Sequence, residues 1–129
     1  MIIRNAILAT LMSAGAATAD AGTIEAYTQQ NFDTLIGAGK PVIVDVAATW
    51  CPTCKAQTPV IEEVAKLPAY SGVAVLVLDF DTGKPALKQL RAGMQSTVLA
   101  FNRGKEVARS IGDTSRVGIE RLFQQAAGN

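Results

Sequence analysis

Residues 44–55 read VDVAATWCPTCK, and this stretch decides the fold. It continues an apolar, β-branched run that begins at Pro41, a pattern typical of a strand covered on both faces of a sheet. The one charge within that run is Asp45. Pro52 suits the first position of a helix, because its missing N–H is not needed there. The stretch therefore predicts a strand leading into Trp50 and a helix whose N-cap lies at or near Cys51.

Further strands and helices alternate on both sides of this stretch. Residues 24–27 predict a short strand, and Phe32, Leu35 and Ile36 mark a helix capped by Thr28 or Asn31. Downstream, strands are predicted over residues 73–78, 97–101 and 107–111, a short helix at 87–90, and a last helix, capped by Thr114 or Ser115, with its apolar stripe at 119–126. The order is β-α-β-α-β-α-β-β-α. Strands connected through helices are expected to be parallel, whereas the hairpin at residues 102–105 implies an antiparallel pair. The sequence therefore predicts an α/β fold with a mixed central sheet flanked by helices.

Composition excludes several classes of function. The chain has 129 residues, 12 basic and 11 acidic, so we expect one domain and no basic face for nucleic acid. Aromatic residues make up 5% of the chain, too few for base-stacking platforms. The sequence contains no histidine, which excludes Ser-His-Asp and Cys-His catalytic arrangements.

The first 19 residues have the order of a secretory signal peptide. Arg4 is followed by an uncharged run over residues 6–19 that ends in Ala17-Thr18-Ala19, an A-x-A cleavage site. A membrane anchor is the alternative, but a span needs about 20 apolar residues and this run is shorter. We expect residues 1–19 to be removed and residues 20–129 to form a periplasmic or secreted domain with no membrane association.

The two cysteines of the chain, Cys51 and Cys54, carry most of the functional information. At a helix start, unpaired N–H groups and the positive end of the helix dipole stabilise a thiolate. We expect Cys51, nearest the helix end and more exposed, to attack, and the more buried Cys54 to resolve the mixed disulfide. Two alternatives remain: a structural staple, worth only about 2 kcal/mol for so short a loop, and half of a metal site.

The motif Trp50-Cys51-Pro52-Thr53-Cys54, with Asp45 six residues before Cys51 and Pro59 eight after it, resembles the thioredoxin family. The resemblance implies a thioredoxin fold and thiol–disulfide exchange, and we expect the protein to act as a reductant. It also implies client proteins with thiols or disulfides and a redox partner protein that recycles the dithiol. No soluble cofactor is expected, because the electrons reside on the two sulfurs, and we expect a monomer.

Further site residues follow from the resemblance and from the pattern. Asp45 is the candidate proton acceptor for the Cys54 thiol, through water. Trp50 belongs either to a docking surface beside the disulfide or to the core, since an indole often serves both. The family alignment places these further residues beside the cysteines, in contact with substrate: Pro52, Thr53, Gln95, Ser96 and Thr97.

The sequence departs from the family pattern in three ways. Ser96 stands where thioredoxins have a cis-proline, and we expect the peptide bond before it to be trans, because a cis bond there would cost about 3–4 kcal/mol. Val77 stands where the family has a lysine beside the buried aspartate, so the pKa of Asp45 should rise through desolvation. The dipeptide between the cysteines is Pro52-Thr53 instead of Gly-Pro.

The absence of proline at Ser96 also suggests a different class of function. Cys51 and Cys54 from two protomers would supply four thiolates for an iron–sulfur cluster or zinc. A metal-binding module is therefore the alternative to the oxidoreductase.

Overall fold

Strands and helices alternate along residues 23–129, the part of the chain that the computed structural model describes. The predicted signal peptide, residues 1–19, lies outside the described residues. In chain order the elements are β1 (Ile24–Ala26), α1 (Gln29–Gly37), β2 (Val42–Ala47), α2 (Pro52–Ala65), the 3-10 turn η1 (Pro68–Tyr70), β3 (Ala74–Asp79), α3 (Lys84–Leu90), β4 (Thr97–Asn102), β5 (Lys105–Ile111) and α4 (Arg116–Ala127). The predicted order is confirmed, with η1 as an addition.

The strands form one mixed sheet in the order β1-β3-β2-β4-β5. β3 is parallel to both β1 and β2, whereas β4 is antiparallel to β2 and β5 to β4. β2 therefore lies at the centre, and residues 42–46 are buried along its length. The hairpin turn between β4 and β5 places Arg103 and Gly104 at positive φ, as a two-residue type I′ turn requires.

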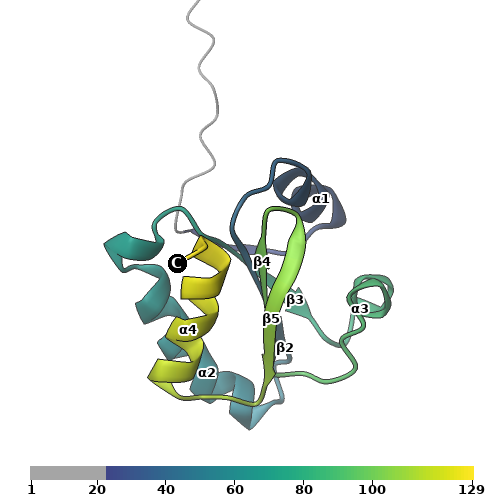
Figure 1. Cartoon of the computed structure of the whole chain (residues 1–129). Coiled ribbons are helices and arrows are strands. Elements are labelled where there is room, and N and C mark those ends of the chain that lie inside the picture. Colours follow the sequence, from purple (N-terminus) through teal and green to yellow (C-terminus); the bar gives the residue numbers. More distant parts are fainter. Residues whose placement is uncertain (1–22) are drawn as a thin grey trace, which may run out of the picture.

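Helices cover both faces of the sheet. Figure 1 shows α2 and α4 on one side and α1 and α3 on the other. Ile43, Ile61 and Phe123 belong to the core between the sheet and α2 and α4. Phe32 and Leu87 belong to the core on the opposite face. Because side chains alternate along a strand, Asp45 points to the same face as Ile43. No helix among residues 23–129 combines the length and apolar character needed to cross a membrane.

The helix ends resolve the capping alternatives. Thr28 caps α1, because its hydroxyl accepts the backbone N–H of Asn31, and Ser115 caps α4 by accepting that of Gly118. Inside α2 the sequence predicts an apolar face of Ala56, Val60, Ile61, Val64 and Ala65, and this prediction is wrong at Ala56. Ala56 is exposed, and Gln57 is buried in its place. The buried face runs through Cys54, Gln57, Ile61 and Val64 because these positions follow the three- and four-residue spacing of a helix.

The core on the α2 and α4 side makes a testable prediction about stability. Phe123 is fully buried, so Phe123→Ala should lower the free energy of unfolding by about 3–5 kcal/mol, through lost burial and the cavity left behind. Val117 lies on the same helix but is 69% exposed, so Val117→Ala should change the free energy of unfolding by no more than about 0.5 kcal/mol. Urea unfolding of both variants measures the difference. Equal losses would show that α4 does not pack as described.

Candidate active site around Cys51 and Cys54

The two cysteines open helix α2. Cys51 is the N-cap residue, with extended backbone, and Pro52 occupies the first turn, as predicted. The backbone N–H of Cys54 donates to Cys51 Sγ at 3.1 Å. Cys51 and Cys54 are joined in a disulfide, with their Cα atoms 5.2 Å apart. When the pair is reduced, the same N–H and the positive end of the helix dipole favour a thiolate at Cys51.

The prediction that Cys51 is the more exposed cysteine is wrong. Cys51 is 2% exposed and Cys54 is 4% exposed, so both sulfurs are covered in the disulfide state. The cover comes from a segment distant in sequence, because Ser96 Oγ lies 3.1 Å from Cys51 Sγ. Ala48 completes the small cluster around the two cysteines.

Ser96, which the resemblance matches to a proline of the family, has an unusual backbone. No cis peptide bond occurs among the described residues, so the predicted trans bond before Ser96 is confirmed. Its φ is +63°, in the left-handed region that is uncommon outside glycine. The backbone N–H donates to Val46 O at 2.8 Å, which extends the β2–β4 pairing by one residue. The hydroxyl lies 3.1 Å from each of the two sulfurs.

Gln57 is a site residue that the sequence reasoning missed. It is fully buried on α2, and its Nε2 donates to Ser96 O at 3.1 Å and to Asp113 O at 3.0 Å. The helix carrying the cysteines is thus tied to the segment carrying Ser96. The available signal was spacing, because Gln57 lies three residues after Cys54 and so on the same helix face.

Asp45 lies on β2, at the centre of the sheet. It is 5% exposed and pairs in register with Val77 of β3, the position that the resemblance matches to a lysine of the family. Burial raises the pKa of Asp45 from 3.8 to about 6, which confirms the predicted direction. The carboxyl faces a cavity of about 110 Å³ whose lining includes Glu62 and no lysine or arginine. No cation in the lining of this cavity therefore opposes the rise in the pKa of Asp45.

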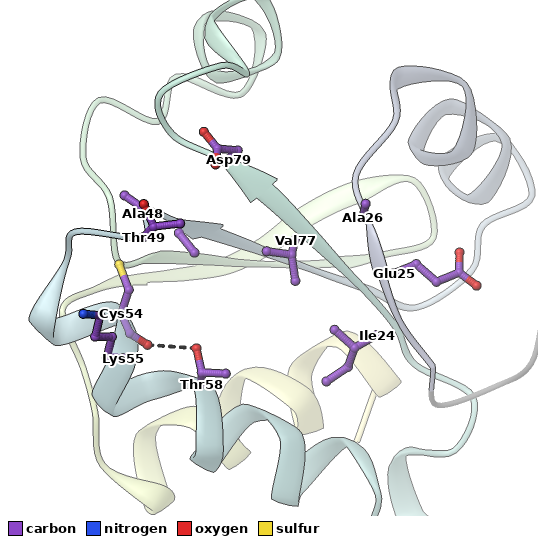
Figure 2. A pocket seen from close by; sticks show the side chains of 11 residues that line it. Ile24, Glu25, Ala26, Ala48, Thr49, Cys54, Lys55, Thr58, Val77 and Asp79 are labelled. Carbon is purple, nitrogen blue, oxygen red and sulfur yellow. Dashed lines mark hydrogen bonds between the residues drawn. The ribbon is translucent and has the colours of Figure 1, made fainter.

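Cys54 lines a larger cavity, of about 550 Å³, which adjoins the cavity that Asp45 faces. The two cavities share Ile24, Ala47, Thr58 and Val77 as lining residues. Figure 2 shows Cys54 and Thr58 on the first turns of α2, on one side of the larger cavity, with Val77 of β3 across from them. This arrangement is compatible with proton transfer from Cys54 to Asp45 through water, which stays a prediction.

Trp50 is a surface residue. Its side chain is 54% exposed, so the core-packing alternative is wrong. Its Nε1–H donates to Asp81 Oδ2 at 2.8 Å, and its ring meets Phe80 edge to face with centroids 6.4 Å apart. These contacts fix the indole beside Cys51 while leaving one side of it available for docking.

The other predicted substrate contacts differ in their accessibility. Pro52 is exposed, whereas Thr53 and Gln95 are half-buried. Thr97 is 1% exposed, and its hydroxyl donates to Met94 O at 2.7 Å. The structure thus brings Ser96 to the sulfurs but turns the Thr97 hydroxyl into its own loop. Contact of these residues with substrate stays a prediction.

A five-stranded mixed sheet with a disulfide at the N-terminus of its α2 helix defines a protein of the thiol–disulfide exchange class. The family model for thioredoxin matches residues 23–125. Thioredoxin from Chlamydia trachomatis is 37% identical over 103 residues, covering 79% of this chain and 97% of that protein. Thioredoxin from Mycolicibacterium smegmatis is 33% identical over 112 residues, and the match covers 83% of this chain and 96% of that protein. Trxlp from Edwardsiella tarda, a solved structure, superposes with a TM-score of 0.76 at 39% identity and covers 78% of this chain and 98% of that one.

The chain belongs to the thioredoxin family, and it is a thiol–disulfide oxidoreductase whose redox pair is Cys51 and Cys54. The metal-binding alternative has no support. Within residues 23–129 no group of three or more histidine, cysteine, aspartate or glutamate side chains is placed to hold a metal ion.

The raised pKa of Asp45 predicts a pH-dependent gain of stability in Asp45→Asn. Below about pH 4 the carboxyl is protonated in both the folded and the unfolded protein, so the substitution should change little. Between about pH 4 and pH 6 the unfolded protein releases this proton while the folded protein retains it, so the wild type loses about 3 kcal/mol relative to the variant over that range, and the loss levels off above pH 6. Urea unfolding of the oxidised proteins between pH 4 and 7.5 measures this difference. A gain that is equal at both pH values would contradict the assignment.

Proposed function

We propose that this protein reduces disulfides of client proteins outside the cytoplasm, as a monomer that needs no soluble cofactor. The observation that carries the proposal is the position of Asp45. Reduction of a client is completed only when Cys54 loses its proton. Asp45 has its pKa raised to about 6, in a cavity that adjoins that of Cys54, so it is well suited to accept this proton.

The chemistry balances over two exchange steps. The Cys51 thiolate attacks one sulfur of the client disulfide, which forms a Cys51–client bond and releases the other client sulfur as a thiolate. Cys54 then loses its proton and attacks Cys51 Sγ, which forms the Cys51–Cys54 bond and releases the second client sulfur. Two electrons pass to the client. The two protons that left Cys51 and Cys54 are matched by two taken up by the client thiolates.

A recycling partner is needed because each turnover leaves the protein oxidised. One relative is the bifunctional thioredoxin reductase/thioredoxin of Mycobacterium leprae, 32% identical over 107 residues. The match covers 83% of this chain but only 23% of that protein, whose name joins both activities. We propose that this chain receives electrons from a separate dithiol-donor protein. The exposed Trp50, beside Cys51, forms part of the surface on which clients and donor dock.

The reduction potential tests the direction of electron flow. Trp50 is the one tryptophan of the chain, so its fluorescence reports the state of the adjacent disulfide across redox buffers. We expect a value near about −270 mV, as for thioredoxin, whereas a value near about −120 mV would identify an oxidant and refute the reductant role. The double variant Cys51→Ser/Cys54→Ser is the control, and its fluorescence should not follow the buffer.

The proposed location rests on the sequence of residues 1–19 and predicts export with cleavage. Full-length protein expressed in a Gram-negative host should be recovered from the periplasm with a new N-terminus at or near Asp20. Leu8→Arg places a charge in the uncharged run and should leave the protein unprocessed. N-terminal sequencing of both proteins gives the result. Wild-type protein that still begins at Met1 would contradict the proposal.

A further inference from the structure

The Ser96 hydroxyl lies between the two sulfurs of the redox pair. Its oxygen is 3.1 Å from Cys51 Sγ and 3.1 Å from Cys54 Sγ, and Ser96 is 4% exposed. A serine hydroxyl rotates, so its single proton can be donated toward either sulfur. Sulfur in a disulfide is a weak acceptor, whereas a thiolate carries a full charge and makes a charge-assisted hydrogen bond. The contact is therefore strongest when one of the two sulfurs is ionised.

We propose that Ser96 is a catalytic residue whose hydroxyl donates a hydrogen bond to whichever sulfur carries the negative charge. In the dithiol protein this sulfur is Cys51 Sγ. In the mixed disulfide Cys51 is bonded to the client, and the charge forms on Cys54 Sγ as it loses its proton. The hydroxyl turns from the first sulfur to the second without movement of the backbone, because it is within reach of both. Ser96 transfers no proton in either step.

The backbone of Ser96 is built to hold this hydroxyl in place. A φ of +63° costs free energy in a residue with a side chain, so the conformation persists only where surrounding contacts enforce it. Three hydrogen bonds do so: the Ser96 N–H donates to Val46 O at 2.8 Å, and Ser96 O accepts from Gly112 N–H at 3.0 Å and from Gln57 Nε2 at 3.1 Å. They tie Ser96 to β2, to the end of β5 and to α2.

The rest of the segment that carries Ser96 is fixed as well. At its start, the Arg109 guanidinium of β5 donates to Leu90 O at 2.8 Å and to Arg91 O at 3.0 Å. At its end, the Thr97 hydroxyl donates to Met94 O. A donor held by a fixed frame stabilises charge without reorganisation during the reaction.

The direction of the effect follows from the hydrogen bond. A donor that stabilises the Cys51 thiolate lowers the pKa of Cys51 and favours the dithiol over the disulfide. The disulfide thus becomes easier to reduce than it would be without the hydroxyl. The inference rests on thiol–disulfide exchange at this site, and it does not depend on the direction of electron flow or the location proposed above.

Ser96→Ala tests the proposal, because alanine keeps the Cβ and the left-handed backbone and removes only the hydroxyl. The pKa of Cys51, followed by thiolate absorbance in the reduced protein, should rise by about one unit. At a pH above the Cys51 pKa of both proteins, the equilibrium with glutathione should shift about tenfold toward the disulfide, which corresponds to a potential about 30 mV more negative. Both readouts compare the variant with the wild type, so they hold whatever the absolute potential is. An unchanged or lowered pKa would overturn the proposal.

Two further variants separate the hydroxyl from other effects. Ser96→Gly also removes the hydroxyl but relieves the strained backbone, so it should shift the pKa of Cys51 as far as alanine does. A shift of the Cys51 pKa in the Ser96→Gly variant alone would assign the effect to the backbone and overturn the proposal. The glycine variant also provides the test if the alanine variant does not fold. Ser110→Ala removes a buried hydroxyl from β5, where Ser110 pairs with Val98, and should leave both readouts unchanged.

Discussion

Strand β2 lies between two paired neighbours and two layers of helices, so residues 42–46 are buried and have little contact with bulk water. The apolar residues gain from this position, but Asp45 must keep its charge in a poorly solvating environment or remain protonated. The same strand ends at Ala47, a short turn before Cys51, and this places the sulfur at the start of α2. One buried strand therefore positions both the carboxyl and the attacking sulfur.

The sequence is sufficient for the parts of the site that depend on local patterns. An apolar run followed by a turn and Pro52 predicts the strand, the helix and the N-cap at Cys51. The burial of Cys51 could not be predicted, because its cover comes from a segment more than forty residues away, and contacts of that kind are set by tertiary packing. The left-handed backbone of Ser96 and the burial of Gln57 have the same origin, since each is stabilised by hydrogen bonds to distant elements.

The Ser96 hydroxyl contacts both sulfurs, but their other neighbours differ. Cys51 Sγ lies at the positive end of a helix and receives the N–H of Cys54, which favours the thiolate. Cys54 borders a largely apolar cavity, where a thiol is favoured over a charge until a base accepts its proton. The two exchange steps need this order of ionisation, in which the attacking sulfur loses its proton first and the resolving sulfur loses its proton later.

Val77, the position that the resemblance matches to the family's lysine, bears on the proton transfer that we propose for the second of these steps. An ordinary carboxyl of pKa near 4 is a poor acceptor for a thiol proton, because the pKa of a thiol is about 8.5. With its pKa raised to about 6, Asp45 narrows that gap by roughly two units, which makes the proton transfer about 3 kcal/mol less unfavourable. A cation at position 77 would stabilise the carboxylate and widen the gap again. Burial of Asp45 thus costs stability at neutral pH but makes its carboxylate a stronger base, and the same burial produces both effects.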